Sequence, residues 1–182
     1  MTTGGTVLPI ARWGEPVMHA RTRPVTEFDD HLKSLVADMF ATMYAAEGVG
    51  LAATQVGVDL AVFVFDCPDD DHVRHSGVIC NPVVELPEGK DRKLEAADEG
   101  CLSLPGVHVE VERPVHIRVR AQDAYGEDVV IEASGLEARV IQHETDHLDG
   151  VLILDRTTRD ERKRALRELR ESERAREREQ AA

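Results

Sequence analysis

The sequence predicts an α+β fold with mostly antiparallel, short-stranded sheets around a central helix. Three observations predict it. An amphipathic helix is expected near the N-terminus, several short strands then follow without regular helices between them, and a helix with two histidines comes late in the chain. Strands that follow one another directly favour antiparallel pairing, because short hairpins can join them. A charged helix is expected after this core.

The N-terminal amphipathic helix is expected from about Glu27 to Glu47. Gly48 and Gly50 then end the helical pattern, and the short segment Leu51–Gln55 follows. Helices commonly end at a glycine, because glycine readily adopts the left-handed backbone conformation that closes a helix. The apolar side chains that recur with the 3.6-residue period are Phe28, Leu32, Leu35, Val36, Met39, Phe40, Met43 and Tyr44.

The middle of the chain predicts short strands. Some of these segments are continuous apolar runs, and others alternate between apolar and polar residues, which is typical of a half-buried strand. Asn81-Pro82 interrupts one run, and Tyr125-Gly126 marks a turn. The strands are expected at Leu60–Phe65, Val78–Leu86, Val107–Val111, Val115–Ala121 and Val129–Ile131.

The late helix has a start and a stop signal. Ser134 and Glu137 match a capping box, in which each side chain satisfies an exposed backbone N–H group. Gly150 is placed to end the helix. Its apolar positions are Leu136, Val140, Ile141 and Leu148.

The same helix carries an HExxH pattern. His143 and His147 lie one turn apart on one face, so that both imidazoles can bind one metal ion. Glu144 lies about 100° around the helix, where it can reach a water molecule on that metal. The alternative is a surface helix that carries two histidines by chance.

A catalytic site of this type needs a third protein ligand. No histidine follows His147, and the later glutamates lie in the charged C-terminal segment. The upstream candidate is Cys101, which follows Gly100 and whose thiolate is a strong ligand for soft or borderline metals. A lone cysteine can instead be a small buried apolar residue, and we interpret Cys67 and Cys80 in that way.

The C-terminal segment Thr157–Gln180 predicts a charged helix that begins with a capping box at Thr158 and Glu161. Only Ala165, Leu166 and Leu169 can pack on the body, so the helix is expected to fray after Leu169. We therefore expect one domain over residues 1–169 and a charged tail over 170–182. Either the arginines of this helix are only solvated, or they contact ribosomal RNA.

Composition limits the function classes. Hydrophobic residues make up 42% of the 182 residues and the net charge is −13. Residues 156–182 hold ten Lys/Arg and seven Asp/Glu, so the remaining body is strongly acidic, which disfavours DNA binding. Three unpaired cysteines indicate a reducing compartment. No signal peptide or membrane span is visible, so we expect a cytoplasmic protein with no membrane partner.

Three separated motifs resemble those of the peptide deformylase family. Their order and spacing make the likeness far more specific than HExxH alone, and it runs from about residue 7 to 155. The motifs are Gly48–Gln55, Glu99–Ser103 and Gln142–Gly150, and the segments Val7–Ile10 and Gly14–Val17 are similar to the family's N-terminal stretch.

The resemblance implies an amidase that removes the formyl group from the N-terminal N-formylmethionine of new polypeptides and releases formate. Cys101, His143 and His147 would be the metal ligands, and a water molecule would take the fourth position. Glu144 would act as general base and then as general acid. The Gln55 amide and the Leu102 backbone N–H would stabilise the developing oxyanion.

The resemblance also implies a pocket for the methionine side chain. Its expected walls are Val49, Leu136 and Val140, with the aliphatic stem of Arg139 at the rim. Gly50 is expected to contact the substrate backbone, although both motif glycines can serve only to end a helix. Leu136 and Val140 can equally be ordinary core residues, and Gln55 a polar residue at the end of an element.

Two residues are expected to support the site without binding metal. Glu99 and Gln142 would orient ligands and loops. Some family members have arginine three residues after the proline of the second motif, where this chain has His108. That difference leaves open what supports Cys101.

The resemblance favours Fe²⁺ as the bound ion, although a Cys-His-His set also accepts Zn²⁺, Ni²⁺ or Co²⁺. Two other functions remain as alternatives. An HExxH peptidase would cut internal peptide bonds, and a non-catalytic metal-stabilised module would have four protein ligands and no adjacent base.

Overall fold

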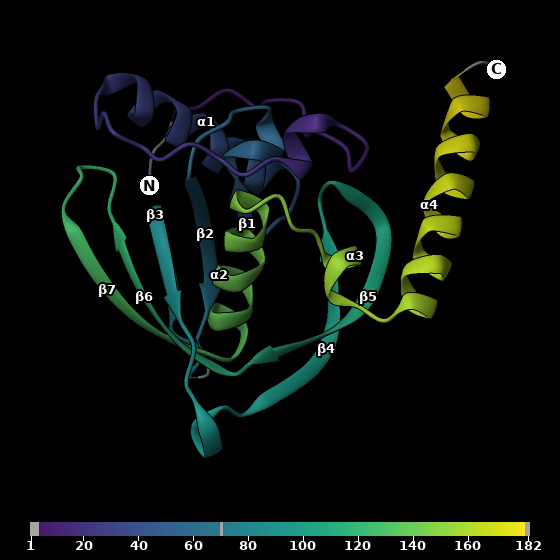
Figure 1. Cartoon of the computed structure of the whole chain (residues 1–182). Coiled ribbons are helices and arrows are strands. Elements are labelled where there is room, and N and C mark those ends of the chain that lie inside the picture. Colours follow the sequence, from purple (N-terminus) through teal and green to yellow (C-terminus); the bar gives the residue numbers. More distant parts are fainter. Residues whose placement is uncertain (1–3, 70, 181–182) are drawn as a thin grey trace.

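The computed structural model describes residues 4–69 and 71–180, so both ends of the chain fall partly outside the described residues. Helix α2 (Gly135–Leu148) lies in the centre, between a five-stranded sheet and a long β-hairpin (Figure 1). The structure is therefore a mixture of helices and antiparallel sheet, in agreement with the fold class predicted from the sequence.

Every neighbouring strand pair of the five-stranded sheet is antiparallel, in the order β1-β2-β3-β6-β7. The predicted strands are present, although β2 is shifted to Val62–Pro68 and β3 begins at Arg74, four residues before its apolar run. Hydrogen bonding continues into exposed residues such as Arg74, where burial leaves no signal in the sequence. The strands are β1 (Gly50–Ala52), β2 (Val62–Pro68), β3 (Arg74–Glu85), β6 (His116–Gln122) and β7 (Asp128–Ser134).

The hairpin consists of β4 (Leu94–Cys101) and β5 (Leu104–Pro114). The sequence predicted part of β5 but not β4. Most side chains of β4 are exposed, so apolar and polar residues do not alternate along it. Strand β1 was also missed, because all three of its residues are buried and it is too short to show a period.

Helix α1 (Asp30–Ala45) starts later than expected because Asp29 caps it. The Asp29 carboxylate accepts hydrogen bonds from the backbone N–H groups of His31 and Leu32. The remaining helical elements are η1 (Pro16–His19), η2 (Ala53–Val56), η3 (Gly89–Asp91), α3 (Ile153–Arg156) and α4 (Arg159–Gln180).

The sheet buries side chains on both faces. Phe63 and Phe65 of β2 pack in the cluster that includes α2, whereas Val62 and Val64 pack in the cluster that includes α1. This follows from the two-residue period of a strand. A third cluster joins the hairpin to α3 and α4 and consists of Cys101, Leu104, Val107, Val109, Val111, Ile153, Leu154, Ala165 and Leu169.

The capping box expected at the start of α2 does not form. Ser134 is the N-cap residue, but its side chain makes no capping hydrogen bond. Glu137 lies 3.4 Å from His75 instead, so its carboxylate is directed to the sheet. Gly135 has a φ of 53°, which turns the chain sharply at the point where the cap would form.

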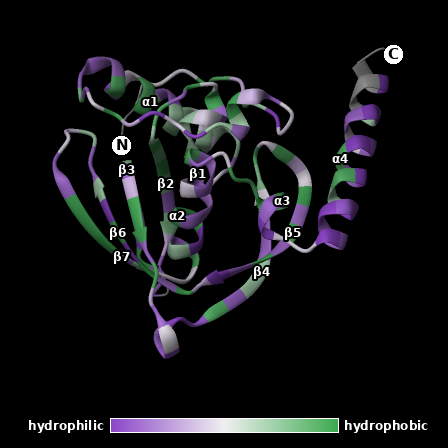
Figure 2. Cartoon of the chain, viewed as in Figure 1, coloured by the Kyte–Doolittle hydropathy of each residue, from purple (hydrophilic) through white to green (hydrophobic). Residues whose placement is uncertain are grey.

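Helix α4 stands on the outer side of the hairpin and is mostly hydrophilic (Figures 1 and 2). The Thr158 hydroxyl accepts a hydrogen bond from the Glu161 N–H at 3.3 Å, which matches one half of the expected capping box. The structure continues the helix to Gln180, beyond Leu169, so fraying of the tail stays a prediction. None of the helices in the described ranges is both long and apolar enough to cross a membrane.

Candidate metal centre and active site

Three side chains from two elements converge beside the hairpin. Cys101 ends β4, and His143 and His147 lie one turn apart on α2. One ligand atom from each lies within 4.8 Å of the others. Cys101 Sγ and His147 Nε2 are 3.4 Å apart, close to the roughly 3.5 Å expected for two ligands of one tetrahedral ion. The donor set therefore fits a divalent metal ion.

Glu99 orients one of the histidines. Its Oε2 atom lies 3.1 Å from His143 Nδ1, which leaves Nε2 of the same ring for a metal. This is the usual carboxylate–histidine arrangement behind a metal ligand. The opposite case is His147, whose buried Nδ1 has no hydrogen-bond partner within the described residues.

Arg113 of β5 neutralises Glu99 from the other side. Its guanidinium binds both carboxylate oxygens, at 2.5 Å and 2.9 Å, and a further nitrogen donates to Asp146 at 2.9 Å. Burial disfavours the charged form of Glu99, but hydrogen bonds from His143 and Arg113 outweigh it and lower its pKa to about 2. Asp146 also accepts from Arg156, at 2.6 Å and 3.1 Å.

Neither Arg113 nor Asp146 was predicted from the sequence, although Arg113 leaves a signal in it. On β5 the side chains of Val107, Val109 and Val111 are all buried, and Arg113 is the next residue in the same phase. A charge that continues an inward-facing pattern needs a buried partner of opposite charge. Asp146 leaves no comparable signal, because the turn of α2 that carries it is polar throughout.

His108 lies opposite Gly100 in the hairpin, with its ring close against that glycine, and lines the cavity beside Cys101. It is exposed to solvent and makes no ion pair in the described parts of the chain. Arg113 and Arg139, and not the residue at position 108, thus supply the cations that pair with Glu99 behind the candidate metal ligands.

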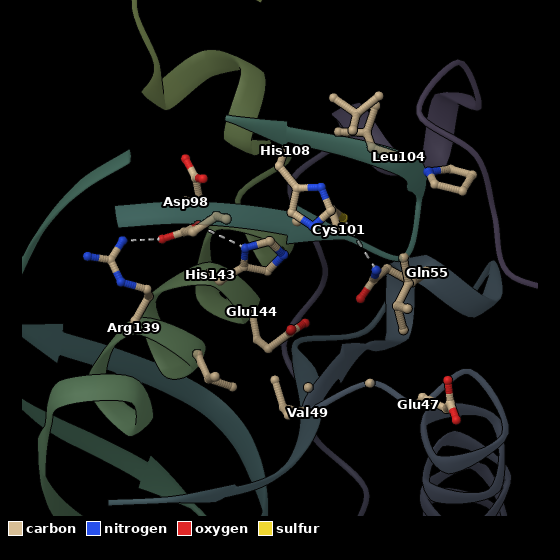
Figure 3. Close-up of a pocket in the computed structure, with 18 of the residues that line it drawn as sticks. Glu47, Val49, Gln55, Asp98, Cys101, Leu104, His108, Arg139, His143 and Glu144 are labelled. Carbon is tan, nitrogen blue, oxygen red and sulfur yellow. Dashed lines mark hydrogen bonds and ion pairs between the residues drawn. The ribbon is translucent and has the colours of Figure 1, made fainter. Parts of the chain in front are cut away.

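Glu144 points into the cavity from α2, next to His143 in the sequence (Figure 3). Its side chain is buried, and Oε2 has no hydrogen-bond partner within the described residues. Burial raises the pKa of Glu144 to about 7, partly opposed by the nearby His143. The carboxylate is thus shielded from bulk solvent and more easily protonated than an exposed glutamate.

Gln55 and Leu102 lie on the wall of the cavity opposite Glu144. The Gln55 amide oxygen accepts from the Ala52 N–H at 2.9 Å, which directs its nitrogen toward Ser103 Oγ at 3.3 Å and Cys101 Sγ at 3.7 Å. Leu102 follows Cys101 in the turn between β4 and β5 and lines the cavity.

The N-terminal segment fastens these two loops. The Ala11 N–H donates to the Gln55 carbonyl at 2.8 Å, and the Trp13 N–H donates to the Ser103 carbonyl at 3.1 Å. Two segments that are distant in the sequence are thereby held by the same short stretch of backbone.

The cavity has a volume of about 570 Å³. Val49, Leu136 and Val140 line one side, and the first two are partly exposed at its mouth. Arg139 lies at the rim, where its guanidinium is held by Glu99 at 2.8 Å and by the carbonyl of Glu95 at 2.8 Å.

Gln142 does not reach the metal ligands. Its amide donates to the carbonyls of Pro114 and Ala138, at 3.0 Å and 2.9 Å, and so fastens the end of β5 to α2. Of the two residues expected to support the site, only Glu99 touches a candidate ligand.

A thiol and two imidazoles that converge beside a cavity, with a buried carboxylate and an amide donor in its wall, can bind a metal and hydrolyse an acyl group. The family model of polypeptide deformylase matches residues 7–163 of the chain. The chain belongs to the polypeptide deformylase family. This confirms the family predicted from the three motifs. Members of this family are amidases that act on N-formylmethionyl peptides.

Relatives and solved structures of peptide deformylases agree with this assignment. Peptide deformylase 1 of Streptomyces avermitilis is 50% identical over 170 residues, which cover 93% of this chain and 78% of that protein. The structure of the Thermus thermophilus peptide deformylase has a TM-score of 0.80 and 43% identity, over 91% of this chain and 94% of that one. The peptide deformylase of Ehrlichia chaffeensis in complex with actinonin has a TM-score of 0.85 and 33% identity, over 93% and 99%.

Proposed function

We propose that this member of the deformylase family hydrolyses N-formylmethionyl peptides with a divalent metal ion held by Cys101, His143 and His147 on α2 and β4. The observation that carries the proposal is the convergence of these three ligand atoms within 4.8 Å. When bound there, a divalent ion supplies a Lewis acid that polarises the formyl carbonyl and activates water.

Glu144 would carry the proton in this reaction. Its free Oε2 accepts a proton from the water molecule whose oxygen bonds to the formyl carbon. When the carbon–nitrogen bond breaks, the same oxygen delivers the proton to the departing amine, so that formate and a free N-terminus result. A buried carboxylate suits this exchange because little water competes for its proton.

Gln55 and Leu102 would stabilise the negative charge on the formyl oxygen. The Gln55 carboxamide is fixed by the Ala52 N–H, so its nitrogen is held toward Cys101 without further reorganisation. One such donor is worth about 3–4 kcal/mol of barrier. The backbone N–H of Leu102 is proposed as the second donor.

The methionine side chain would occupy the apolar side of the cavity formed by Val49, Leu136 and Val140. The stem of Arg139 would close its rim, because the guanidinium is already held by Glu99 and cannot swing into the pocket easily. An unbranched side chain fits such a pocket better than a branched one.

We propose Fe²⁺ as the resident ion, with Zn²⁺, Ni²⁺ and Co²⁺ as substitutes, because a thiolate and two imidazoles accept all four. Anaerobic purification followed by metal analysis and a formate assay on the same sample tests this. Activity that follows the zinc content and not the iron content would contradict the choice of iron.

Replacement of Glu144 tests the mechanism. Glu144→Gln should retain one metal ion per chain while formate release from formyl-Met-Ala falls by about 10²–10⁴-fold. Glu137→Gln is the matched control on the same helix, outside the cavity, and should keep its activity. A Glu144→Gln variant with normal turnover contradicts the mechanism, and fragments released from an unblocked peptide would favour an endopeptidase.

We also propose that the exposed arginines of α4 contact ribosomal RNA, in the cytoplasm where new chains emerge. Arg167, Arg170 and Arg174 are all exposed on this helix, and phosphate contacts of this kind weaken as salt rises. Co-sedimentation with ribosomes, with and without residues 170–182, at two salt concentrations tests the contact. Binding that does not change on deletion contradicts it.

A further inference from the structure

The second glycine of the first motif lies directly against Glu144. A Cβ atom built on Gly50 would come within 2.9 Å of both Cγ and Cδ of Glu144 and closer still to Oε1. Gly50 does not have a positive φ, so its backbone conformation is open to any residue. An added methyl group would therefore collide with its neighbours without straining its own backbone, and the atoms it meets belong to the proposed base.

Neither backbone can retreat from this contact. Gly50 pairs with Phe65 in the β1–β2 ladder, and the next three residues after it are fully buried. On the other side, Ile141 and His147 hold α2 within the core. A collision between Gly50 and Glu144 must therefore be relieved by rotation of the Glu144 side chain.

We propose that Gly50 is a positioning residue for Glu144. Because Gly50 has no Cβ, the Glu144 carboxylate can lie against its Cα and stay in place beside the candidate metal ligands. This inference rests on the proposed role of Glu144 as the base. It differs from the role expected from the sequence, in which Gly50 serves the substrate backbone. Because the contact is made in the structure without substrate, it acts on the enzyme before any peptide binds.

The first glycine of the motif makes a different contact and provides the control. A Cβ atom on Gly48 would meet Leu102 Cδ1 at 2.9 Å and its other neighbours at 3.5 Å. The end of the Leu102 side chain can move aside without displacing the proposed base, whereas the atoms that a Cβ on Gly50 would meet belong to that base. Gly48→Ala should therefore affect proton transfer far less than Gly50→Ala.

The kinetic test compares kcat with KM. Gly50→Ala should lower kcat for formyl-Met-Ala by about 100-fold, the usual cost of displacing a reacting group by about 1 Å. Its metal content and KM should stay near those of the unmodified protein. A rise in KM with an unchanged kcat would overturn the inference and favour a role in substrate binding alone.

A shorter base should relieve the collision. In the Gly50→Ala background, Glu144→Asp draws the carboxylate back by one methylene and so relieves the closest contact, that to Oε1, although a carbon stays at the Cγ position. The double variant should therefore be more active than the product of the two single effects predicts. Independent effects that simply multiply would overturn the inference. Gly48→Ala combined with Glu144→Asp should show such independence and serves as the matched cycle.

Stability gives a readout that does not depend on activity. If Gly50→Ala collides with Glu144, it should lower the urea midpoint of the otherwise unmodified protein but not that of Glu144→Ala, where the carboxylate is gone. An equal loss in both backgrounds overturns the inference even if Gly50→Ala alone folds poorly. If the unmodified protein releases no formate, the proposed function fails while this stability cycle still decides the contact.

Discussion

Buried carboxylates on the two sides of α2 differ in the charges that surround them. Toward the hairpin, Glu99 and Asp146 are surrounded by arginines, and the pKa of Glu99 falls to about 2. Toward β1, Glu144 makes no ion pair within the described residues, and burial raises its pKa to about 7. Glu99 on β4 is thus held in its charged form by the cations around it, whereas Glu144 on α2 is protonated more easily than an ordinary glutamate.

This difference shows how the surroundings of a buried carboxylate suit it to one of two proposed roles, the support of a metal ligand or the exchange of a proton. A carboxylate that orients a metal ligand must stay charged, so cations are placed around it. A carboxylate that accepts and returns a proton must not be stabilised too strongly in either form. If the comparison is right, substitutions on the hairpin side should damage stability and metal retention, whereas those on the β1 side should damage turnover.

The largest effect on the hairpin side is expected from Arg113→Met. Its removal leaves only Arg139 to pair with Glu99 and Arg156 to pair with Asp146, so the free energy of unfolding should fall by about 3 kcal/mol, the lower end of the cost of breaking a buried ion pair. Urea unfolding measures this. Arg118→Met, which loses only exposed contacts to Glu85 and Glu132, is the control and should cost less than about 1 kcal/mol.

A smaller effect is expected from Arg156→Met at the end of α3. Arg156 holds Asp146, which shares Arg113 with Glu99, so its loss should loosen the support of His143. Metal loss to a chelator should accelerate by about tenfold or less, below the range for a residue that touches a ligand directly.

Arg162→Met is the matched control for that experiment. Whereas Arg156 joins α3 to α2, Arg162 joins α4 to α3, through Asp155 at 2.7 Å and the Leu154 carbonyl at 3.1 Å, and it lies outside the Asp146 network. Equal metal loss from both variants would mean that the position of α4, and not the charge network, governs the site.

The smallest effect concerns Glu137, a third buried carboxylate of α2. Burial raises its pKa above the ordinary value; His75 opposes this shift and Asp69 adds to it. The folded chain then holds the proton more tightly than the unfolded chain, so stability falls as pH rises from about 4.5 through the folded pKa. Glu137→Gln should remove this loss.

Urea unfolding of both proteins between pH 4 and pH 8 measures the difference. Glu137→Gln should become progressively more stable than the unmodified protein as pH rises. Glu132→Gln, at an exposed position of β7, should show no such trend. A difference that stays constant over this range would mean that Glu137 has its ordinary pKa in the folded state.

Much of the fold was readable because burial leaves periodic patterns. The strands β2, β3, β5, β6 and β7 and the helices α1, α2 and α4 all have such patterns, and the structure contains each of them. Strand β4 has none, because its side chains mostly face solvent and its place is set by pairing with β5. Pairing of that kind is invisible without knowledge of the partner.

The residues of the site also differ in whether the sequence alone identifies them. Cys101 and His143 could be named as candidates because their chemistry is rare and specific, and the structure brings them together with His147. The contact between Gly50 and Glu144 could not be predicted, because the two residues are about ninety positions apart and only their fit in the folded chain brings them together. Arg113 lies between these cases, since its inward phase on β5 marks it as buried but does not name its partner.

The hydrogen bonds of the early residues Ala11 and Trp13 to the Gln55 and Ser103 loops have a consequence for biosynthesis. Thr22 likewise binds the carbonyl of Leu148, across 126 positions of the chain. Closing such long loops costs entropy before any contact repays it. A nascent chain therefore cannot form the Thr22–Leu148 contact until translation has passed Leu148, so this N-terminal segment becomes fixed only late in synthesis.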